Sequence, residues 1–189
     1  PPCQSFSLAG LRDHSNDRNV LPWEFAKFVE KTKPKIALLE NVSGILRAFK
    51  INEKPYYAWF EVAKAFAKIG YIPLCLHVNA KYVGAAQNRP RFILLAMRDD
   101  IYTGVTRNST DKNFLEAIAP AKILFDRVRR GEDPEYGCLP YFDMEKNPDF
   151  FDSKIFVNFK THENSDLVTV RDAIDDLRTV KGKNSLYVE

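Results

Sequence analysis

Short apolar runs alternate with amphipathic helices in the first half of the chain, and this alternation limits the fold most strongly. Residues 21–30 have helical periodicity, with apolar side chains on one face at Leu21, Phe25, Phe28 and Val29. Lys33 and Pro34 end this helix. The run 36–39 is short and continuous, which predicts a strand buried on both faces of a parallel sheet. Glu40 then lies at the carboxyl end of that strand, where open α/β sheets bind ligands.

A second helix and two further strands follow. Residues 57–69 predict an amphipathic helix that Gly70 closes, with its aromatic side chains in the core. The segments 71–78 and 91–97 have strand patterns, and we expect Cys75 and His77 to be strand residues without a further role. The pattern predicts an α/β fold.

Residues 101–166 form an insertion of unknown role between two parts that are easier to interpret. Residues 114–130 have helical periodicity and Gly131 stops the helix. The basic end of that helix, at Arg127, Arg129 and Arg130, fits a phosphate contact, and it equally fits the preference of cations for a helix C-terminus. Residues 136–159 show no clear period and suggest an ordered segment packed by aromatic side chains.

Composition favours an ordinary soluble domain. The 189 residues are 45% hydrophobic, which is ample for one core, and the net charge of +3 allows a nucleic acid partner without requiring one. The three cysteines are widely spaced and odd in number, which disfavours a disulfide framework and a metal site. No apolar run reaches the ~18 residues that span a bilayer. We expect a cytoplasmic protein, nucleoid-associated if bacterial, with no membrane or metal partner.

Cys3 is the side chain best placed to act as a nucleophile. Two prolines precede it and hold the backbone extended, and small polar residues follow it in loop-like sequence. A lone cysteine is also often a small buried hydrophobe, so the segment by itself leaves both interpretations open. The chain starts at Pro1 rather than Met, which we interpret as the sign of a longer protein.

The loop 79–90 offers a second candidate cluster. It places Gln87, Arg89 and Arg91 at alternate positions, which in extended backbone lie on one side. An amide and two guanidinium groups suit a planar heterocycle with phosphates, although three exposed residues can alternate without a function. A further basic cluster, at Arg47, Lys50 and Lys54, is best interpreted as a solvated face.

Three motifs in order resemble the cytosine-C5 methyltransferase family. They are Pro-Pro-Cys-Gln at residues 1–4, Glu-Asn-Val at 40–42 and Gln-x-Arg-x-Arg at 87–91. The resemblance covers residues 1 to about 98 and resumes at 168–177, which is similar to the segment that leads toward the family's target-recognition region. It divides the chain into a catalytic core portion (1–100), the insertion (101–166) and a final segment (167–189). The implied fold is a Rossmann-like class I methyltransferase sheet.

The resemblance implies methyl transfer from S-adenosylmethionine to C5 of a flipped-out cytosine in double-stranded DNA, as in restriction-modification. Cys3 would add to C6 and a shielded Glu40 would protonate the N3 side, with Arg89 and Arg91 completing the catalytic set. Arg91 would hold O2. Leu21 would contact the cofactor. The implied substrate-binding residues are Pro2, Gln4, Ser5, Ser7, Asn41, Val42 and Gln87.

The chain also departs from the family pattern. Ala85 and Ala86 replace the usual Val-Pro before Gln87, and no glycine-rich cofactor turn is present in the sequence. We therefore expect N- and C-terminal segments of the same enzyme as partners. The alternatives are a transfer-RNA cytosine-C5 methyltransferase, and a non-catalytic or split-enzyme fragment that binds nucleic acid. A thiol hydrolase fits less well, because no histidine is clearly placed to activate Cys3.

Overall fold

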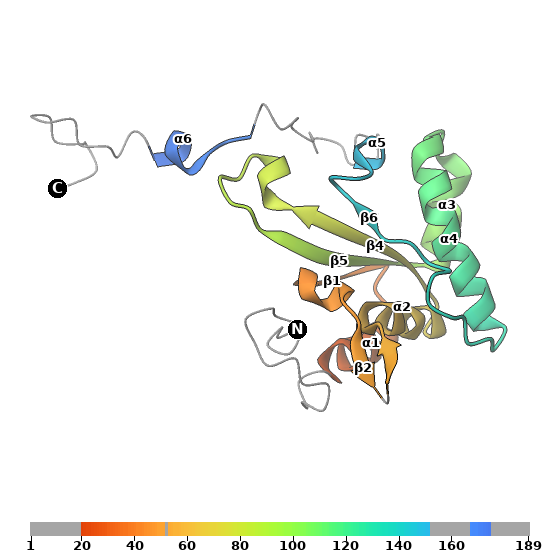
Figure 1. The fold of residues 1–189 in the computed structure, drawn as a ribbon. Helices are drawn as coiled ribbons and strands as arrows, with labels where there is room; N and C mark the ends of the chain where they lie inside the picture. Colours follow the sequence, from red (N-terminus) through yellow and green to blue (C-terminus); the bar gives the residue numbers. More distant parts are fainter. Residues whose placement is uncertain (1–19, 52, 152–166, 175–189) are drawn as a thin grey trace, which may run out of the picture.

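A computed structural model describes residues 20–51, 53–151 and 167–174. Its main sheet has four strands in the order β1-β5-β4-β6 (Figure 1). Their bounds are β1 Ile36–Val42, β4 Tyr71–Asn79, β5 Pro90–Arg98 and β6 Phe142–Asp143. A separate two-stranded sheet pairs β2 Phe49–Ile51 with β3 Lys54–Tyr56, a hairpin that the sequence analysis did not predict.

The strand directions differ from the parallel sheet that we predicted. β5 pairs antiparallel with β1 and with β4, and only the short β6 pairs parallel with β4. The prediction was wrong because β4 and β5 are joined by a connection of only ten residues, 80–89, with one short 3-10 turn, η3 Ala80–Val83. Such a connection reverses the chain, whereas parallel neighbours need a longer crossover. The strands themselves lie where the apolar runs predicted them.

β1 is buried on one face, which also corrects the prediction. Ala37, Leu39 and Asn41 are buried, whereas Ile36 and Leu38 are 48% and 55% exposed. Alternate strand residues point to opposite faces, so Glu40 shares the exposed face with Ile36 and Leu38. Glu40 lies within β1, two residues before the end of the strand. Its position near the carboxyl end is therefore as predicted.

Helix α1 (Leu21–Thr32) has the predicted extent but a different buried face. Lys33, at φ 48°, adopts the left-handed conformation that ends the helix. The buried side chains are Pro22, Ala26 and Val29, whereas Phe28 is 60% exposed. Phe28 was predicted to lie on the buried face, and the packing of α1 against α2 turns it outward instead.

Helix α2 (Ala58–Lys68) supplies the centre of the core. Gly70, at φ 94°, follows its C-terminal end, as predicted, because glycine adopts this conformation without steric cost. Trp59, Phe60 and Phe66 are at most 2% exposed, and the Trp59 ring contacts Phe92 of β5 at 6.2 Å between centroids. The predicted aromatic stripe is confirmed as core. α2 therefore covers the face of the sheet that carries Phe92.

The segment that we predicted as an insertion, residues 101–166, packs on the same core, and we keep the name inserted segment for it. Its described part contains most of α3 (Asp99–Asn108), α4 (Lys112–Arg129), β6 and α5 (Pro148–Phe151), and α4 contacts both α2 and β4. The side chain of Asp111 caps α4 by accepting from the amide of Phe114, and Gly131 follows the helix at φ 87°. α3 was not predicted, since only two of its apolar residues pack against the core, Tyr102 and Val105.

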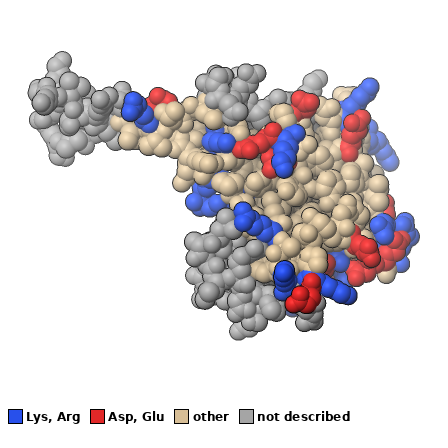
Figure 2. Space-filling view, in the orientation of Figure 1, with Lys and Arg blue, Asp and Glu red and all other residues tan. Residues whose placement is uncertain are grey.

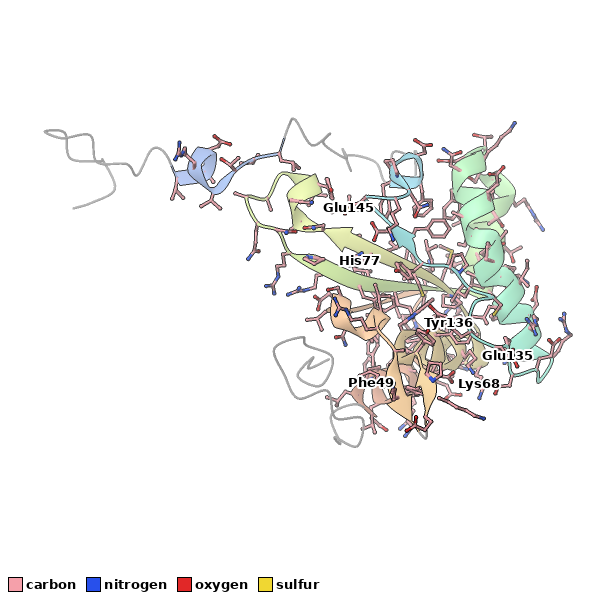
Figure 3. All side chains as sticks on the ribbon, viewed as in Figure 1. Phe49, Lys68, His77, Glu135, Tyr136 and Glu145 are labelled. Atoms are coloured by element: carbon pink, nitrogen blue, oxygen red, sulfur yellow. The ribbon has the colours of Figure 1, made fainter. Side chains whose placement is uncertain are left out.

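Aromatic pairs hold the later part of the insertion, as we predicted for its described residues. The rings of Tyr57 and Tyr136 stack with centroids 3.4 Å apart, and Trp59 meets Tyr141 edge to face at 5.6 Å. Figure 3 shows Tyr136 beside the α2 end of the molecule. Residues 152–159 of that prediction lie outside the described residues. Helix α6 (Val170–Ile174) falls within the segment 168–177, of which the structure describes residues 168–174.

None of the helices that the structure describes combines the length and the apolar character needed to span a bilayer. Within the same part of the chain, no three His, Cys, Asp or Glu side chains gather as a metal site would require. Cys75 and Cys138 are free thiols, and burial raises the pKa of Cys75, which is fully buried in β4.

Candidate functional site

The structure brings Glu40 and Arg91 together, although 50 residues of sequence separate them. Arg91 pairs with Val42 across the antiparallel ladder, one strand over from Glu40. The Arg91 Nε lies 2.8 Å from Glu40 Oε1, and the two side chains are 20% and 53% exposed. The Arg91 guanidinium also donates to the carbonyl of Pro90. An acid and a guanidinium thus share one open face of the sheet.

Glu40 lacks the shielding that the sequence analysis expected. Its carboxylate is half exposed, and the strand register explains why, since Glu40 lies on the face that the described helices leave open at β1. A bound base would have to supply the missing burial. Arg91 has a fixed direction, because its ion pair and its hydrogen bond to Pro90 hold the guanidinium plane from two sides.

Asn41 and Val42, two predicted substrate-binding residues, lie on opposite faces. Val42 is partly buried and shares the face of Glu40 and Arg91. Asn41 is 1% exposed on the other face, where its Oδ1 accepts from the amide of Val42 at 2.8 Å. Its Nδ2 is buried without a hydrogen-bond partner among the described residues. Asn41 therefore offers no direct contact on the open face, and any role there acts through the backbone of Val42.

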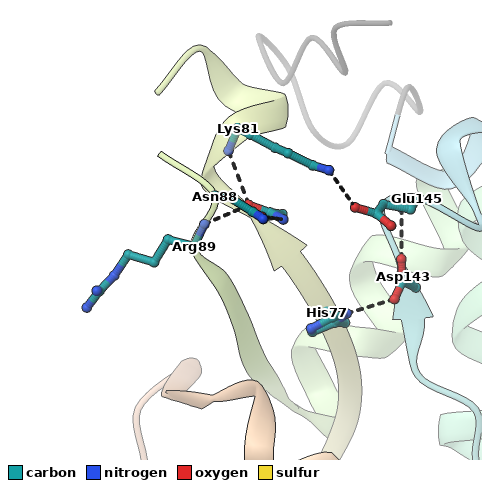
Figure 4. A network of polar contacts seen from close by, with 7 residues as sticks. His77, Lys81, Asn88, Arg89, Asp143 and Glu145 are labelled. Atoms are coloured by element: carbon teal, nitrogen blue, oxygen red, sulfur yellow. Dashed lines mark hydrogen bonds and ion pairs between the residues drawn. The ribbon is translucent and has the colours of Figure 1, made fainter. Parts of the chain in front are cut away.

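Gln87 and Arg89 lie in the connection between β4 and β5, and both are exposed. The extended backbone predicted for residues 87–91 is present only from Pro90, because the chain bends at Gln87, whose amide donates to the carbonyl of Ala85. The side chain of Arg89 points away from its polar neighbours (Figure 4). Its guanidinium therefore remains available to an anionic ligand.

Asn79 holds this connection closed at its base. Its Oδ1 accepts from the amides of Arg89 at 3.0 Å and Lys81 at 3.3 Å, and its Nδ2 donates to Asn88 Oδ1 at 2.8 Å (Figure 4). The side chain is 8% exposed, so these bonds are sheltered from water. Asn at a strand end before a turn is a signal for such bonding, yet the sequence analysis did not use it.

His77 makes a long-range contact that was not predicted from the sequence. Its Nδ1 lies 2.7 Å from Asp143 Oδ2, across 66 residues of sequence. Burial raises the pKa of Asp143, but the bonds from His77 and from the amide of Glu145 outweigh it, and the net pKa lies below the ordinary value. His77 is a residue of β4, as predicted, but its contact with Asp143 was not predicted, because the contact is long-range and nothing near either residue signals it.

The remaining candidate residues do not lie at the Glu40–Arg91 pair in the described part of the chain. Leu21 is partly buried in the first turn of α1. The predicted residues Pro2, Cys3, Gln4, Ser5 and Ser7 lie outside the described residues. At the end of α4, Arg127 and Arg130 bind Glu132, and Arg129 donates to the carbonyl of Lys68. These contacts favour the structural interpretation of that basic end over a phosphate site.

Charges on the molecule are mixed in sign. The face shown in Figure 2 carries basic and acidic side chains around a broad uncharged area. The basic residues at the candidate site are Arg89 and Arg91. Arg91 pairs with the acid Glu40. Lys50 and Lys54 are exposed on the β2–β3 hairpin. Binding of a polyanion would depend on such clusters rather than on a general field.

The mixed α/β sheet, with an acid and an arginine on its open face, is consistent with a Rossmann-like methyltransferase catalytic domain. The model of the C-5 cytosine-specific DNA methylase family matches residues 1–135. The chain therefore belongs to this family. The match spans the Glu40–Arg91 pair and continues into the inserted segment.

Curated relatives agree with the family. The chain is 37% identical over 155 residues to the type II methyltransferase M.DdeI of Desulfomicrobium norvegicum, which covers 78% of this chain and 37% of the relative. It is 35% identical over 102 residues to the orphan methyltransferase M.SPRI of Bacillus phage SPR, and 37% identical over 102 residues to the type II methyltransferase M1.HphI of Haemophilus parahaemolyticus. These two alignments cover 53% and 52% of this chain. The chain spans 22% to 37% of the length of these three relatives.

Proposed function

We propose that this chain carries the base-side chemistry of cytosine C5 methylation in double-stranded DNA. The observation that carries the proposal is the pairing of Glu40 with Arg91 at 2.8 Å on the open face of the sheet. Both residues lie within the family match over residues 1–135, in segments that resemble motifs of that family. A carboxyl group beside a guanidinium can address the N3 edge and the O2 of one pyrimidine ring.

The proposed reaction starts at Cys3. Its thiolate adds to C6 of the cytosine, the electrons of the C5–C6 double bond move between C4 and C5, and those of the C4–N3 double bond move to N3, where Glu40 delivers a proton. Arg91 holds O2 during this step. When bound, S-adenosylmethionine would supply the methyl group that the enamine carbon C5 takes. Removal of the C5 proton by a base then re-forms the C5–C6 double bond and expels the Cys3 thiolate, and the N3 proton returns to Glu40.

The base must leave the duplex to reach Glu40, at a cost of a few kcal/mol. The exposed guanidinium of Arg89 and the amide of Gln87 lie on the adjoining connection, where they would bind phosphates of the opened strand. We assign the same task to Gln4, Ser5 and Ser7, with Pro2 directing the Cys3 side chain. Val42 would line the pocket for the ring, and buried Asn41 would hold the backbone of Val42.

On the cofactor side, the described residues offer little. Leu21 is partly buried at the start of α1, and its apolar side chain fits a contact with an adenine ring. We propose no other cofactor contact from this chain. The rest of that site would come from further segments of the same enzyme, and the protein would act in the cytoplasm, associated with the nucleoid if it is bacterial.

The test uses the full-length protein with duplex DNA that carries 5-fluorocytosine and S-adenosylmethionine. A covalent adduct should form, because fluorine cannot leave C5 as a proton does. Cys3→Ala should abolish both the adduct and methyl transfer while DNA binding is retained. Glu40→Gln should lower methyl transfer by roughly 10²–10⁴-fold, the usual contribution of a general acid.

Glu24→Gln is the matched control, because Glu24 is an exposed glutamate of α1 that pairs with Lys27. It should leave methyl transfer unchanged. Full activity of the Cys3→Ala variant would contradict the mechanism. Transfer to transfer RNA in place of duplex DNA would contradict the substrate, and adduct-free binding of DNA by the unmodified protein would indicate a non-catalytic module.

A further inference from the structure

We propose that the inserted segment positions the connection that carries Gln87 and Arg89 and leads into Arg91 of β5, through Asp143 and Glu145. This inference rests on the proposed function, because it concerns how the base-binding arginines are held. Asp143 belongs to β6, and Glu145 follows it in the turn before α5. Figure 4 shows both acids facing residues of β4 and of η3. We call this group of contacts the acidic brace.

The first contact of the brace joins β6 to β4. The Nδ1 of His77 lies 2.7 Å from Asp143 Oδ2, and these side chains are only 22% and 13% exposed. The amide of Met144 also donates to the carbonyl of His77 at 3.0 Å. Asp143 is itself fixed, since its Oδ1 accepts from the amide of Glu145 and its own amide donates to Asn147. These contacts hold the insertion to β4 at His77, two residues before Asn79.

The second contact reaches the connection directly. Glu145 Oε1 lies 2.9 Å from Lys81 Nζ, and the same ammonium group lies 4.5 Å from the centre of the Tyr82 ring. Bonds from Lys81 and then from Tyr82 lower the pKa of Glu145 below its ordinary value. Tyr82 is 9% exposed, so the turn η3 is anchored to the core on one side and to Glu145 on the other.

Asn79 links the acidic brace to Arg89, at the other end of the connection. The amides of Lys81 and Arg89 both donate to Asn79 Oδ1, and the amide of Ala80 donates to the carbonyl of Arg89 at 3.4 Å. A displacement of Lys81 therefore changes the bond that positions Arg89. This continuity gives a physical route from the insertion to the candidate site through short polar contacts, without any movement of the core.

The loop sequence shows why a brace is useful here. The connection lacks a proline between Gly84 and Gln87, and Gly84, at φ 83°, has no Cβ to restrict its backbone. Gln87, Asn88 and Arg89 are exposed and are held mainly at the base of the connection by Asn79. Contacts from the insertion compensate for stiffness that the local sequence does not supply.

The experiment measures hydrogen exchange of the amides of Lys81 and Arg89 in the chain itself. Glu145→Ala should increase their exchange about two- to fivefold, the range expected for loss of a half-exposed ion pair. Asp143→Asn should have at least an equal effect, because its contact is more buried. The double variant Lys81→Glu with Glu145→Lys should restore much of the protection, since it rebuilds the ion pair with reversed charges.

The matched control is Glu132→Gln, because Glu132 is an acid of the same insertion that binds Arg127 and Arg130 instead. It should leave exchange at Lys81 and Arg89 unchanged. Unchanged exchange in both brace variants, or an equal increase in the control, would overturn the inference. Failure of the double variant Lys81→Glu with Glu145→Lys to restore protection would also count against the inference.

Activity provides a separate readout in the full-length protein. Loss of positioning should lower kcat for methyl transfer about two- to fivefold in Glu145→Ala, matching the exchange effect, with little change in KM for DNA. If the unmodified protein transfers no methyl group to cytosine, the proposed function fails, and the exchange data still decide whether the brace exists. If methyl transfer is normal and exchange does not change, the brace alone fails.

Discussion

β4 and β1 are both antiparallel neighbours of β5, yet their surroundings differ sharply. Residues 71–76 of β4 are all buried, because α2 and α4 pack against this strand and β6 covers its outer edge. β1 alternates between buried and exposed residues and ends the sheet within the described chain. The covered strand carries the core, and the half-open strand carries Glu40. An acid on β1 can thus meet a ligand, whereas one on the first six residues of β4 could not.

The largest expected loss of stability is in the core beneath β4, the covered side of the comparison. Phe66 is 0% exposed beneath the sheet, so Phe66→Ala should lower the free energy of unfolding by about 3–5 kcal/mol through lost burial and a cavity. Urea unfolding monitored by circular dichroism would measure it. A loss below about 1 kcal/mol would mean that the two halves of the sheet do not differ as the burial suggests.

A smaller loss of stability is expected for a substitution at the contact between the insertion and α2. Lys64, whose side chain is 9% exposed, binds Glu61 at 2.9 Å and Asp133 at 2.6 Å. Lys64→Met retains the aliphatic stem and removes the charge, so it should cost about 1 kcal/mol in the same unfolding measurement. Lys27→Met, which breaks an exposed pair with Glu24, is the control and should change little. Equal losses in both variants would contradict the idea that burial strengthens the Lys64 contacts.

Acid should weaken the contacts between the insertion and β4. The pKa values of Asp143 and Glu145 lie below their ordinary values of 3.8 and 4.5 in the folded protein. Lowered carboxyl pKa values stabilise the fold above the unfolded-state pKa, and this contribution is lost as pH falls through the folded pKa. The urea midpoint should therefore fall from about pH 5 downward, by the equivalent of about 1 kcal/mol or less. In Asp143→Asn this fall should be shallower, and an identical pH profile would exclude Asp143 as a source.

The smallest effect is expected on the open face of β1. Leu38 is 55% exposed, so Leu38→Ala should change the free energy of unfolding by about 0.5 kcal/mol or less. Leu39→Ala is the matched variant, since Leu39 follows in the same strand and is 1% exposed. It should cost about 2–5 kcal/mol. Similar values for the two would mean that Leu38 is covered in solution.

Much of the local structure could be predicted from sequence, because it depends on near neighbours. The periodicity of residues 57–69 and the following Gly70 predict α2 and its end, and the strand pattern of residues 91–97 predicts β5. The three motifs also identified the family, which the match over residues 1–135 confirms. The strand directions were mispredicted, since a short apolar run has the same composition in either orientation.

Residues distant in sequence met in ways that no local pattern signals. His77 and Asp143 form a pair over 66 residues, and Glu145 reaches Lys81 from the insertion. By itself, the sequence determined most of the helices and strands, although not α3 or the β2–β3 hairpin, and it supplied the residue types for which we propose attack, protonation and binding of a pyrimidine. Only the tertiary structure decided that Glu40 and Arg91 share an open face while Asn41 is buried, because strand pairing and helix packing choose which side of each strand meets water.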